Sequence, residues 1–434
     1  MQRQAAPATS NRRTGTGSPD AESDVHPVGT WLLQMGFDLW IGSVYNRVVV
    51  LPDDHRIAPG TLITSNHQRD VDGPLLGTVL VRRRGLRFQW PLPYFATRED
   101  LFRPGILARL TVHWPRAISA ALGHISLAWF FPLGHAEPMR RVREFTLGEA
   151  LRALVDAGLG DAECASLLNA RGRRELAAIA AMSLREAIAL APSAIMEHWW
   201  GLRRLELSAL RKLAPAFREC VDAQLAHFTQ RLDRGHSVYF APEGTISMDG
   251  HFGRIRAGFF RLVRLAESPP WILPMALAYD TLGPGRTRVV VRIGTRFRAD
   301  KSQDRRALDH VLRHAILSLT PITPSHLIAR FLLHGPPSFT QEDFTDWLAR
   351  ALAALRAANR SLDPLFVNRN VDAIVNARLR WLERQGFVVR RGSSFDNACP
   401  RDRAPGWHTP ASVARYLDNN LAELSPETDR VLPC

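Results

Sequence analysis

The sequence predicts an α/β fold in which a central mixed sheet is flanked by helices and extended by a helical insertion and a small C-terminal module. Three observations predict it. Short apolar stretches that read as strands alternate with a helical pattern over residues 48–90, as in βαβ units. An Ala-rich stretch at 143–230 has Leu, Ile and Val at three- and four-residue spacing, which is typical of helices. After Gly-Pro-Pro at 335–337, which reads as a linker, strongly amphipathic helical patterns follow.

Length and composition indicate a folded protein of two or three domains. The chain has 434 residues, of which 46% are hydrophobic and 23% are charged, so it can bury a full core. The net charge of +14 is unusual and indicates an anionic partner, which would be a lipid surface, a nucleic acid or an acidic substrate. A generally Arg-rich composition is an equally good explanation of this charge.

The N-terminal part divides into a polar tail and an apolar element. Residues 1–27 are rich in Ser, Thr, Arg and Gly and lack the apolar core of a signal peptide, which predicts a disordered tail. Residues 28–59 form the next element, and the apolar stretch at 28–50 predicts an apolar or amphipathic helix. This helix either packs against the main domain or lies shallowly in a membrane surface, for which its tryptophans are suited.

We expect no transmembrane helix. The longest uncharged run, about 117–134, is at the short edge of the length that crosses a bilayer, and it contains His124 and Pro132. A buried helix followed by a strand explains this run better.

The four cysteines are widely spaced and include no Cys-x-x-Cys pair. They therefore predict neither a zinc site nor a disulfide framework, and they fit a reducing cytoplasm. We expect no metal and no cofactor.

A candidate catalytic pair follows the strand predicted at 61–64. His67 and Asp72 lie five positions apart in the polar segment that ends this strand, before the helix predicted at 73–82 and a strand at 86–90. A carboxylate within reach of a neutral imidazole holds it in one tautomer and stabilises the imidazolium, so the pair is suited to general-base catalysis. Open α/β sheets place their chemistry at such strand exits.

A second motif lies far downstream. The strand predicted at 235–241 runs into Pro-Glu-Gly-Thr at 242–245, and an apolar strand centred on Pro274 follows. His-x4-Asp followed by Pro-Glu-Gly-Thr resembles the glycerolipid acyltransferase superfamily, which includes the 1-acylglycerol-3-phosphate and glycerol-3-phosphate O-acyltransferases. The resemblance covers about residues 60–300, with weaker matches at 98–102 and 130–141.

The resemblance implies a fold, a reaction and site residues. It implies an acyltransferase domain at 60–334, which is interrupted by the helical insertion at about 145–230. It implies transfer of a fatty acyl group from acyl-CoA or acyl carrier protein to a hydroxyl of a lyso-lipid or glycerol phosphate. In this reaction His67 is the general base and Asp72 orients it. Glu243 and Gly244 form the second essential pair, in which glutamate positions the acceptor or the local loop, and Thr245 supplies a hydroxyl.

Two departures from the family pattern affect the acceptor. Ala241 stands where the family usually has an aromatic residue, and Ile246 stands where it has an arginine that binds the acceptor's phosphate. Another cation must replace this arginine if a phosphate is bound. The candidates are Arg254, Arg256 and either Arg140 or Arg141, each of which is also explained as a surface arginine. Arg69, inside the loop of the candidate pair, is the nearest cation in the sequence. Alternatively, the acceptor is a lipid without a phosphoglycerol group.

The elements after the second motif continue the α/β pattern and then change. A helix is predicted to open at 253–263, strands at 271–279 and 288–294, and a return to helical structure at about 305–333. Residues 338–434 form the C-terminal helical module. Its helices at 340–357 and 371–384, followed by Gly386 and a basic strand at 387–392, resemble a winged helix, and the tail from 393 reads as irregular.

The leading hypothesis is a cytoplasmic acyltransferase that associates peripherally with anionic membranes. Basic and apolar patches without a span are compatible with that location. The rival is a membrane- or nucleic-acid-binding protein on a catalytically retired acyltransferase scaffold. Retention of both motifs argues against it, so we do not expect a nucleic acid as partner.

Overall fold

The structure is a computed structural model, in which the described residues are 27–39, 46–52, 57–81, 92–102, 126, 128–140, 144–196, 199–201, 204–401, 403–407 and 409–425. Residues 1–26 of the predicted tail, the strand predicted at 86–90 and Arg141 lie outside them.

The chain forms strands in three sheets. The strands are β1 (Asn46–Leu51), β2 (Thr61–Ser65), β3 (Tyr94–Arg98), β4 (Ala136–Met139), β5 (Glu144–Thr146), β6 (Trp199–Gly201), β7 (Val238–Tyr239), β8 (Trp271–Asp280), β9 (Thr287–Ile293), β10 (Phe297–Arg298), β11 (Ser338–Thr340), β12 (Val388–Arg391) and β13 (Ser394–Asn397).

The longer helices connect and cover these strands. They are α1 (Pro27–Phe37), α2 (Asp72–Val81), α5 (Leu147–Leu154), α8 (Leu184–Leu190), α10 (Leu207–Asp233), α11 (Ala257–Leu265), α12 (Arg305–Leu319), α13 (Pro324–His334), α14 (Gln341–Ala357), α16 (Val371–Arg384) and α17 (Pro410–Leu424). Shorter turns of helix are η2 (Glu99–Phe102), η3 (Phe131–Gly134), η4 (Val155–Leu159), α6 (Cys164–Leu167), α7 (Ala170–Glu175), η5 (Ala177–Ile179), α9 (Ser193–Met196) and α15 (Leu365–Asn368).

The central sheet is mixed, as predicted. Its strand order is β1-β9-β8-β2-β7-β3-β4, with β10 added beside β8. The run from β8 to β4 is parallel, whereas β9 pairs antiparallel with β8. Strands in the middle of the sheet are buried on both faces, so every residue of β2 is buried and β8 is apolar from Trp271 to Tyr279 without alternation.

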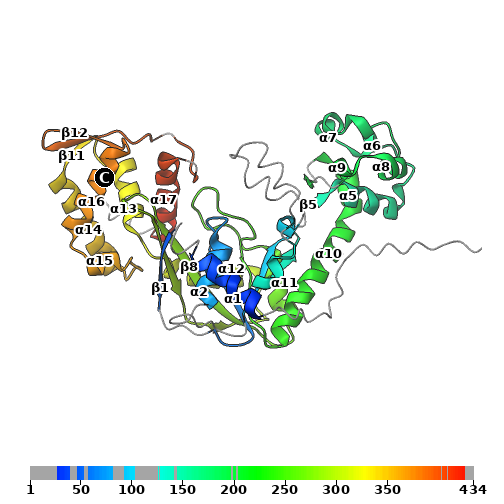
Figure 1. The fold of residues 1–434 in the computed structure, drawn as a ribbon, viewed down its shortest axis with the longest axis horizontal. Coiled ribbons are helices and arrows are strands. Elements are labelled where there is room, and N and C mark those ends of the chain that lie inside the picture. The colour runs from blue at the N-terminus through cyan, green and yellow to red at the C-terminus, as the bar shows by residue number, and fades with distance from the viewer. Residues whose placement is uncertain are drawn as a thin grey trace, which may run out of the picture.

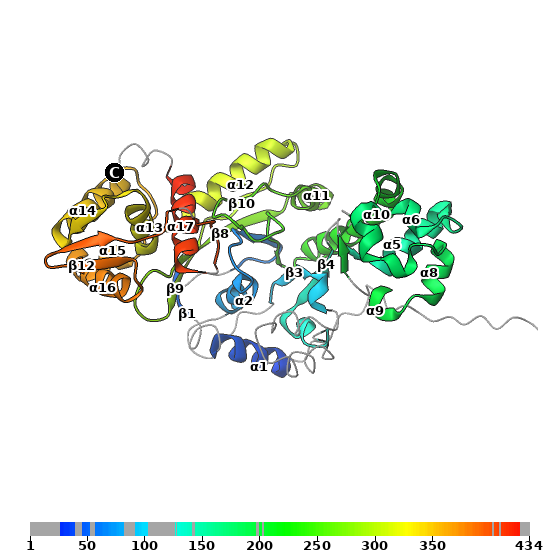
Figure 2. The same cartoon turned by 90° about the horizontal axis from the view of Figure 1, so that it is seen from above.

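Helices cover both faces of this sheet. Helix α2 packs Leu75, Leu76 and Leu80 against one face, and α10, α11 and α12 pack Phe228, Phe259 and Leu312 against the other. Figure 2 shows α2 on one side of the strands and α11 and α12 on the other side. The α/β architecture expected from the sequence is therefore confirmed.

Of the helix predicted at 28–50, the structure confirms residues 28–37, whereas residues 48–50 lie in a strand, which the sequence also predicted there. Helix α1 ends at Phe37, and residues 46–51 form β1, which pairs in parallel with β9. The reason is the Val48–Val50 run, because β-branched side chains favour strands and these pair with Val289–Val291. The central sheet thus begins before residue 60, where the acyltransferase domain was predicted to start.

The insertion forms a helical lobe with a core of its own. Residues such as Phe145, Leu151, Leu184 and Phe217 pack together in it, apart from the cores of the sheet. Helix α10 joins the two parts, because its first half lies in the core of the lobe and its second half packs on the sheet. The lobe stands at the far end of α10 (Figure 1).

The C-terminal module has the element order of a winged helix. Its elements follow one another as α13, β11, α14, α15, α16, β12 and β13, and the three strands form a sheet in the order β11-β13-β12. The helical structure predicted at about 305–333 is present as two helices, because α12 ends at Leu319 and Pro324 begins α13 at a favoured first position. Helix α13 shares one core with α14, α16 and α17, so residues 335–337 do not separate two domains. The tail predicted to be irregular contains β13 and α17.

The module is docked on the end of β8 through a buried ion pair. Arg378 of α16 donates from Nη2 to Asp280 at 2.7 Å and from Nη1 to the Leu282 carbonyl at 2.5 Å. Ser325, in the first turn of α13, donates from its hydroxyl to Asp280 at 2.6 Å. Among the described residues, no helix is long and apolar enough to cross a membrane.

Candidate active site

The topology of the sheet brings the two sequence motifs together. Strands β2 and β7 are parallel neighbours, so the loop that follows each of them leaves the sheet at the same edge. The loop after β2 carries His67, and the loop after β7 carries Glu243. His67 and Glu243 are 176 positions apart in the sequence, yet the His67 amide donates a hydrogen bond of 3.0 Å to Glu243 Oε1.

His67 and Asp72 form a hydrogen-bonded pair. Asp72 lies at the start of α2, where its side chain is fully buried, and Nδ1 of His67 is 3.0 Å from Asp72 Oδ2. The same oxygen accepts the amides of Gln68 at 2.6 Å and Arg69 at 2.9 Å. Because this oxygen only accepts, the proton of the neutral imidazole lies on Nδ1, and Nε2 is left with its lone pair.

The carboxylate of Asp72 is anchored from the neighbouring strand. Tyr279, near the end of β8, donates its hydroxyl to Asp72 Oδ1. Burial, together with the nearby Asp72 charge, raises the pKa of Tyr279 well above its ordinary value, so its hydroxyl stays protonated and able to donate. Asn66, just before the histidine, exchanges two hydrogen bonds with the backbone of Leu277 at 2.8 and 2.9 Å. The histidine loop is therefore fixed on both sides of His67.

Glu243 uses both carboxyl oxygens on backbone amides. Oε1 accepts from His67, and Oε2 accepts from Gly253 at 2.6 Å. Only 2% of Glu243 is exposed, and this burial raises its pKa to about 7, against the opposite effect of the two amides. These contacts favour loop positioning over direct contact with an acceptor as the role of Glu243.

Exchange of Glu243 for glutamine is expected to change how stability depends on pH. A carboxyl whose pKa is raised from 4.5 to about 7 on folding contributes stability that is fully present below pH 4.5 and is lost as the pH rises through 7. Compared with Glu243→Gln, the wild type should therefore lose up to about 3 kcal/mol of unfolding free energy between pH 4.5 and 8. Urea unfolding of both proteins at several pH values measures this difference, and a difference that is independent of pH would refute the raised pKa.

Gly244 is required by the shape of the turn after Glu243. Its φ of +62° lies in the left-handed region, and a Cβ there would lie 3.1 Å from Cγ of Arg256. The stem of Arg256 thus passes over Gly244, and its Nε donates to the Glu243 carbonyl at 3.0 Å. Thr245 follows, half-buried.

The candidate cations differ in what they contact. Arg140 donates two hydrogen bonds to Glu99 and one of 3.2 Å to Glu149. An anionic substrate would have to displace these carboxylates, so Arg140 is a poor phosphate site. Arg256 and Arg254 are exposed beside the second motif.

Arg69 is held between two aromatic rings. Its guanidinium carbon lies 4.4 Å from the ring centre of Tyr279 and 3.7 Å from that of Trp407, which belongs to the C-terminal module. Stacking of this kind stabilises a guanidinium by about 0.5–2 kcal/mol. The C-terminal module thus reaches the loop that carries His67.

Three residues of the site were not identified from the sequence. Asn66 directly precedes the histidine, and its position at a strand end is the one local signal that could have found it. Tyr279 lies in an apolar strand, where an aromatic residue indicates core packing. Trp407 is 338 positions from Arg69, and no sequence pattern relates the two residues.

Comparison with protein families identifies one matching region of the chain. A family model described as Acyltransferase matches residues 200–278. The matched stretch contains Glu243, Gly244 and β8 as far as residue 278, whereas His67 lies before it and Tyr279 directly after it. The general activity of this family is acyl transfer. Residues 200–278 therefore match the glycerolipid acyltransferase family, and the α/β fold is consistent with that match.

Proposed function

We propose that the protein transfers a fatty acyl group from a thioester donor, acyl-CoA or acyl carrier protein, to a hydroxyl of a glycerolipid precursor. One observation carries the proposal. Asp72 holds the Nδ1 proton of His67, and Nε2 is thereby prepared to accept a proton. The side chain of His67 is 19% exposed, so a substrate can reach it.

The reaction needs no protein nucleophile. Nε2 of His67 takes the proton of the acceptor hydroxyl while its oxygen attacks the thioester carbonyl carbon. The buried charge of Asp72 stabilises the resulting imidazolium. The tetrahedral intermediate then breaks its carbon–sulfur bond, and the imidazolium returns the proton to the leaving thiolate. The products are an ester and a free thiol.

The acceptor is proposed to bear a phosphate that Arg256 binds. Ile246 occupies the position of the usual phosphate-binding arginine, and Arg140 is engaged with Glu99. Arg256 is the cation that contacts the second motif, and Arg254 is its exposed neighbour. Arg69 is held by aromatic rings, which favours a role in shaping the loop.

Arg256→Ala is expected to raise the KM for a phosphate-bearing acceptor about ten- to hundredfold. This is the loss of hydrogen bonds to a charged partner, about 1.5–3 kcal/mol. Steady-state kinetics with a lysophosphatidate and with an uncharged monoacylglycerol measure the effect. An equal change for both acceptors would contradict phosphate binding by Arg256.

Association with a membrane surface is supported by exposed apolar residues near the N-terminus. Helix α1 packs on η3. Val28 and Leu32 of α1 and Trp129, in the turn before η3, have exposed side chains, with exposed fractions of 56–69%. Together with the net charge of +14, they favour peripheral binding to anionic lipid.

The winged-helix order of the module does not by itself support nucleic-acid binding. Winged helices that bind DNA use the helix at the position of α16. Here Arg378 of α16 is buried and paired with Asp280, and Arg390 and Arg391 of β12 pair with Glu383 and Asp396. These contacts favour a packing role.

The test is an acceptor panel. Labelled long-chain acyl-CoA and acyl carrier protein would each be offered with glycerol phosphate and a series of lyso-lipids, on vesicles that contain anionic lipid. We expect ester formation with at least one phosphate-bearing acceptor. If folded protein transfers acyl groups to none of them, the proposal is wrong. That result would favour the alternative, a membrane- or nucleic-acid-binding protein on a catalytically retired scaffold.

A further inference from the structure

The loop after the second motif is held from outside the acyltransferase sheet. Residues 247–253, here named the clamp loop, follow Thr245 and include Gly253, whose amide donates to Glu243. The clamp loop also contacts the histidine loop directly, because the Ser247 amide donates to the His67 carbonyl at 2.8 Å. Both backbone polar groups of His67 are thus bound, one by Glu243 and the other by Ser247.

Helix α17 of the C-terminal module binds the outer side of the clamp loop. Asn420 donates from Nδ2 to the Gly250 carbonyl at 2.8 Å, and Asn419 donates to the Asp249 carbonyl at 2.8 Å. Glu423 accepts the amide of Phe252. Helix and loop approach so closely that a Cβ at Gly250 would lie 2.1 Å from the Tyr416 carbonyl oxygen, and the φ of Gly250 is +97°.

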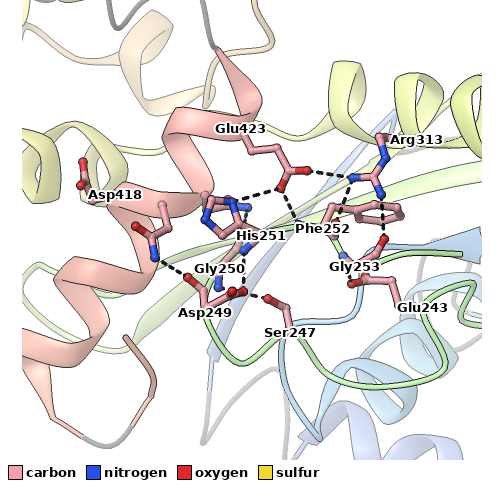
Figure 3. A network of polar contacts seen from close by, with 12 residues as sticks. Glu243, Ser247, Asp249, Gly250, His251, Phe252, Gly253, Arg313, Asp418 and Glu423 are labelled. Atoms are coloured by element: carbon pink, nitrogen blue, oxygen red, sulfur yellow. Dashed lines mark hydrogen bonds and ion pairs between the residues drawn. The ribbon is translucent and has the colours of Figure 1, made fainter. Parts of the chain in front are cut away.

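Glu423 also fixes an arginine that binds the same loop. Arg313 of α12 donates to Glu423 Oε1 at 2.8 Å, to the Phe252 carbonyl at 2.9 Å and to the Gly253 carbonyl at 2.9 Å. Figure 3 shows Glu423 between Arg313 and the clamp loop, with Glu243 below Gly253. Gly253 is therefore held at its carbonyl by Arg313 and at its amide by Glu243.

The orientation of Asn420 is set by a buried histidine of the same module. His326 Nδ1 accepts the Thr323 amide at 3.0 Å, so its proton lies on Nε2, which donates to Asn420 Oδ1 at 3.0 Å. The amide group of Asn420 then points to Gly250. Burial lowers the pKa of His326 to about 4, so the imidazole stays neutral and this direction of hydrogen bonding persists at neutral pH.

We infer that α17 is a positioning element of the active site, in which Glu423 and Asn420 act through the clamp loop on Glu243 and so on His67. This inference rests on the proposed acyl transfer and adds a role for the C-terminal module. The hydrogen bonds of this chain are partly buried, and a displacement of one member is transmitted to the next because the member that moves loses a partner. Loss of Glu423 removes the acceptor of Phe252 and one partner of Arg313 together.

Glu423→Ala is expected to lower kcat about tenfold or more, since displacement of a catalytic group by about 1 Å can cost about a hundredfold. Glu423→Gln keeps an oxygen for the Phe252 amide and should retain most of the activity. The matched control is Asp418→Asn. Asp418 also lies on α17 but pairs with Arg330 and His334 of α13 and points away from the clamp loop (Figure 3). The Asp418→Asn substitution should lower thermal stability without a comparable loss of kcat.

A double-mutant cycle separates positioning from a merely structural role. If Glu423 acts through Glu243, the kcat of the double variant Glu423→Ala/Glu243→Gln should be within about twofold of the kcat of Glu243→Gln alone. The inference is wrong if the double variant loses kcat by the product of the two single losses. It is also wrong if kcat is unchanged in Glu423→Ala, or if Asp418→Asn loses as much kcat as Glu423→Ala.

Hydrogen exchange tests the clamp without reference to acyl transfer. Peptides that cover 247–253 and 64–70 should exchange faster in Glu423→Ala than in the wild type, whereas Asp418→Asn should leave both slow. If the wild type is inactive but these peptides respond as expected, the proposed reaction is wrong and the clamp is still correct. If exchange in both peptides is unchanged in Glu423→Ala, the clamp is wrong.

Discussion

Replacing His67 by alanine is expected to lower the rate of acyl transfer by about 10²- to 10⁴-fold, the usual contribution of a general base. Nε2 of His67 is the proton acceptor that the hydrogen bond to Asp72 leaves available. Since the imidazole is partly exposed and its loop is held through backbone groups, the variant should fold normally. The measurement is the initial rate with a labelled acyl donor and the acceptor identified by the panel.

The matched control for this variant is His310→Ala. His310 is an exposed histidine on α12, outside the two motif loops. We expect the wild-type rate from it. A normal rate in folded His67→Ala protein would remove His67 as the base, whatever the acceptor.

Asp72→Asn is expected to lower the rate by about 10²- to 10⁴-fold, as loss of the carboxylate does in other carboxylate–histidine pairs. Asp72 Oδ2 accepts three hydrogen bonds, and Oδ1 accepts one from Tyr279. An asparagine whose carbonyl oxygen takes the place of Oδ2 retains all three, and its amide can donate to the tyrosine oxygen. The change therefore removes the negative charge that stabilises the imidazolium while the loop keeps its shape.

Two measurements test this explanation of Asp72→Asn. The rate of acyl transfer should fall, and the free energy of unfolding in urea should change by no more than about 1–2 kcal/mol. If the variant is unfolded, or if it is as active as the wild type, the charge is not what Asp72 contributes to the reaction.

The sequence predicted the parts of the site that lie in continuous motifs. His67 and Asp72 share one loop, and the strand before Glu243 was predicted from its apolar residues, so the parallel pairing of β2 and β7 was sufficient to bring them together. The α/β architecture was predictable for the same reason, because hydrophobic patterns identify strands and helices locally.

The rest depends on contacts between distant segments, which one sequence does not reveal. Tyr279 reads as a core aromatic residue, and its hydrogen bond to Asp72 depends on the register between β2 and β8. Glu423 lies in a tail that was predicted to be irregular, and its helix is positioned by packing against distant elements such as α13. Arg140 was a plausible phosphate ligand until the structure placed Glu99 beside it.

The central claim is that His67 and Asp72 act as one unit in acyl transfer, and the most direct test is the rate of the double variant His67→Ala/Asp72→Asn. Residues that act as a unit have effects that do not multiply. The double variant should therefore be as slow as His67→Ala alone, within about twofold. If the two residues act independently, Asp72→Asn will slow His67→Ala by the same factor by which it slows the wild type. That result would contradict the account.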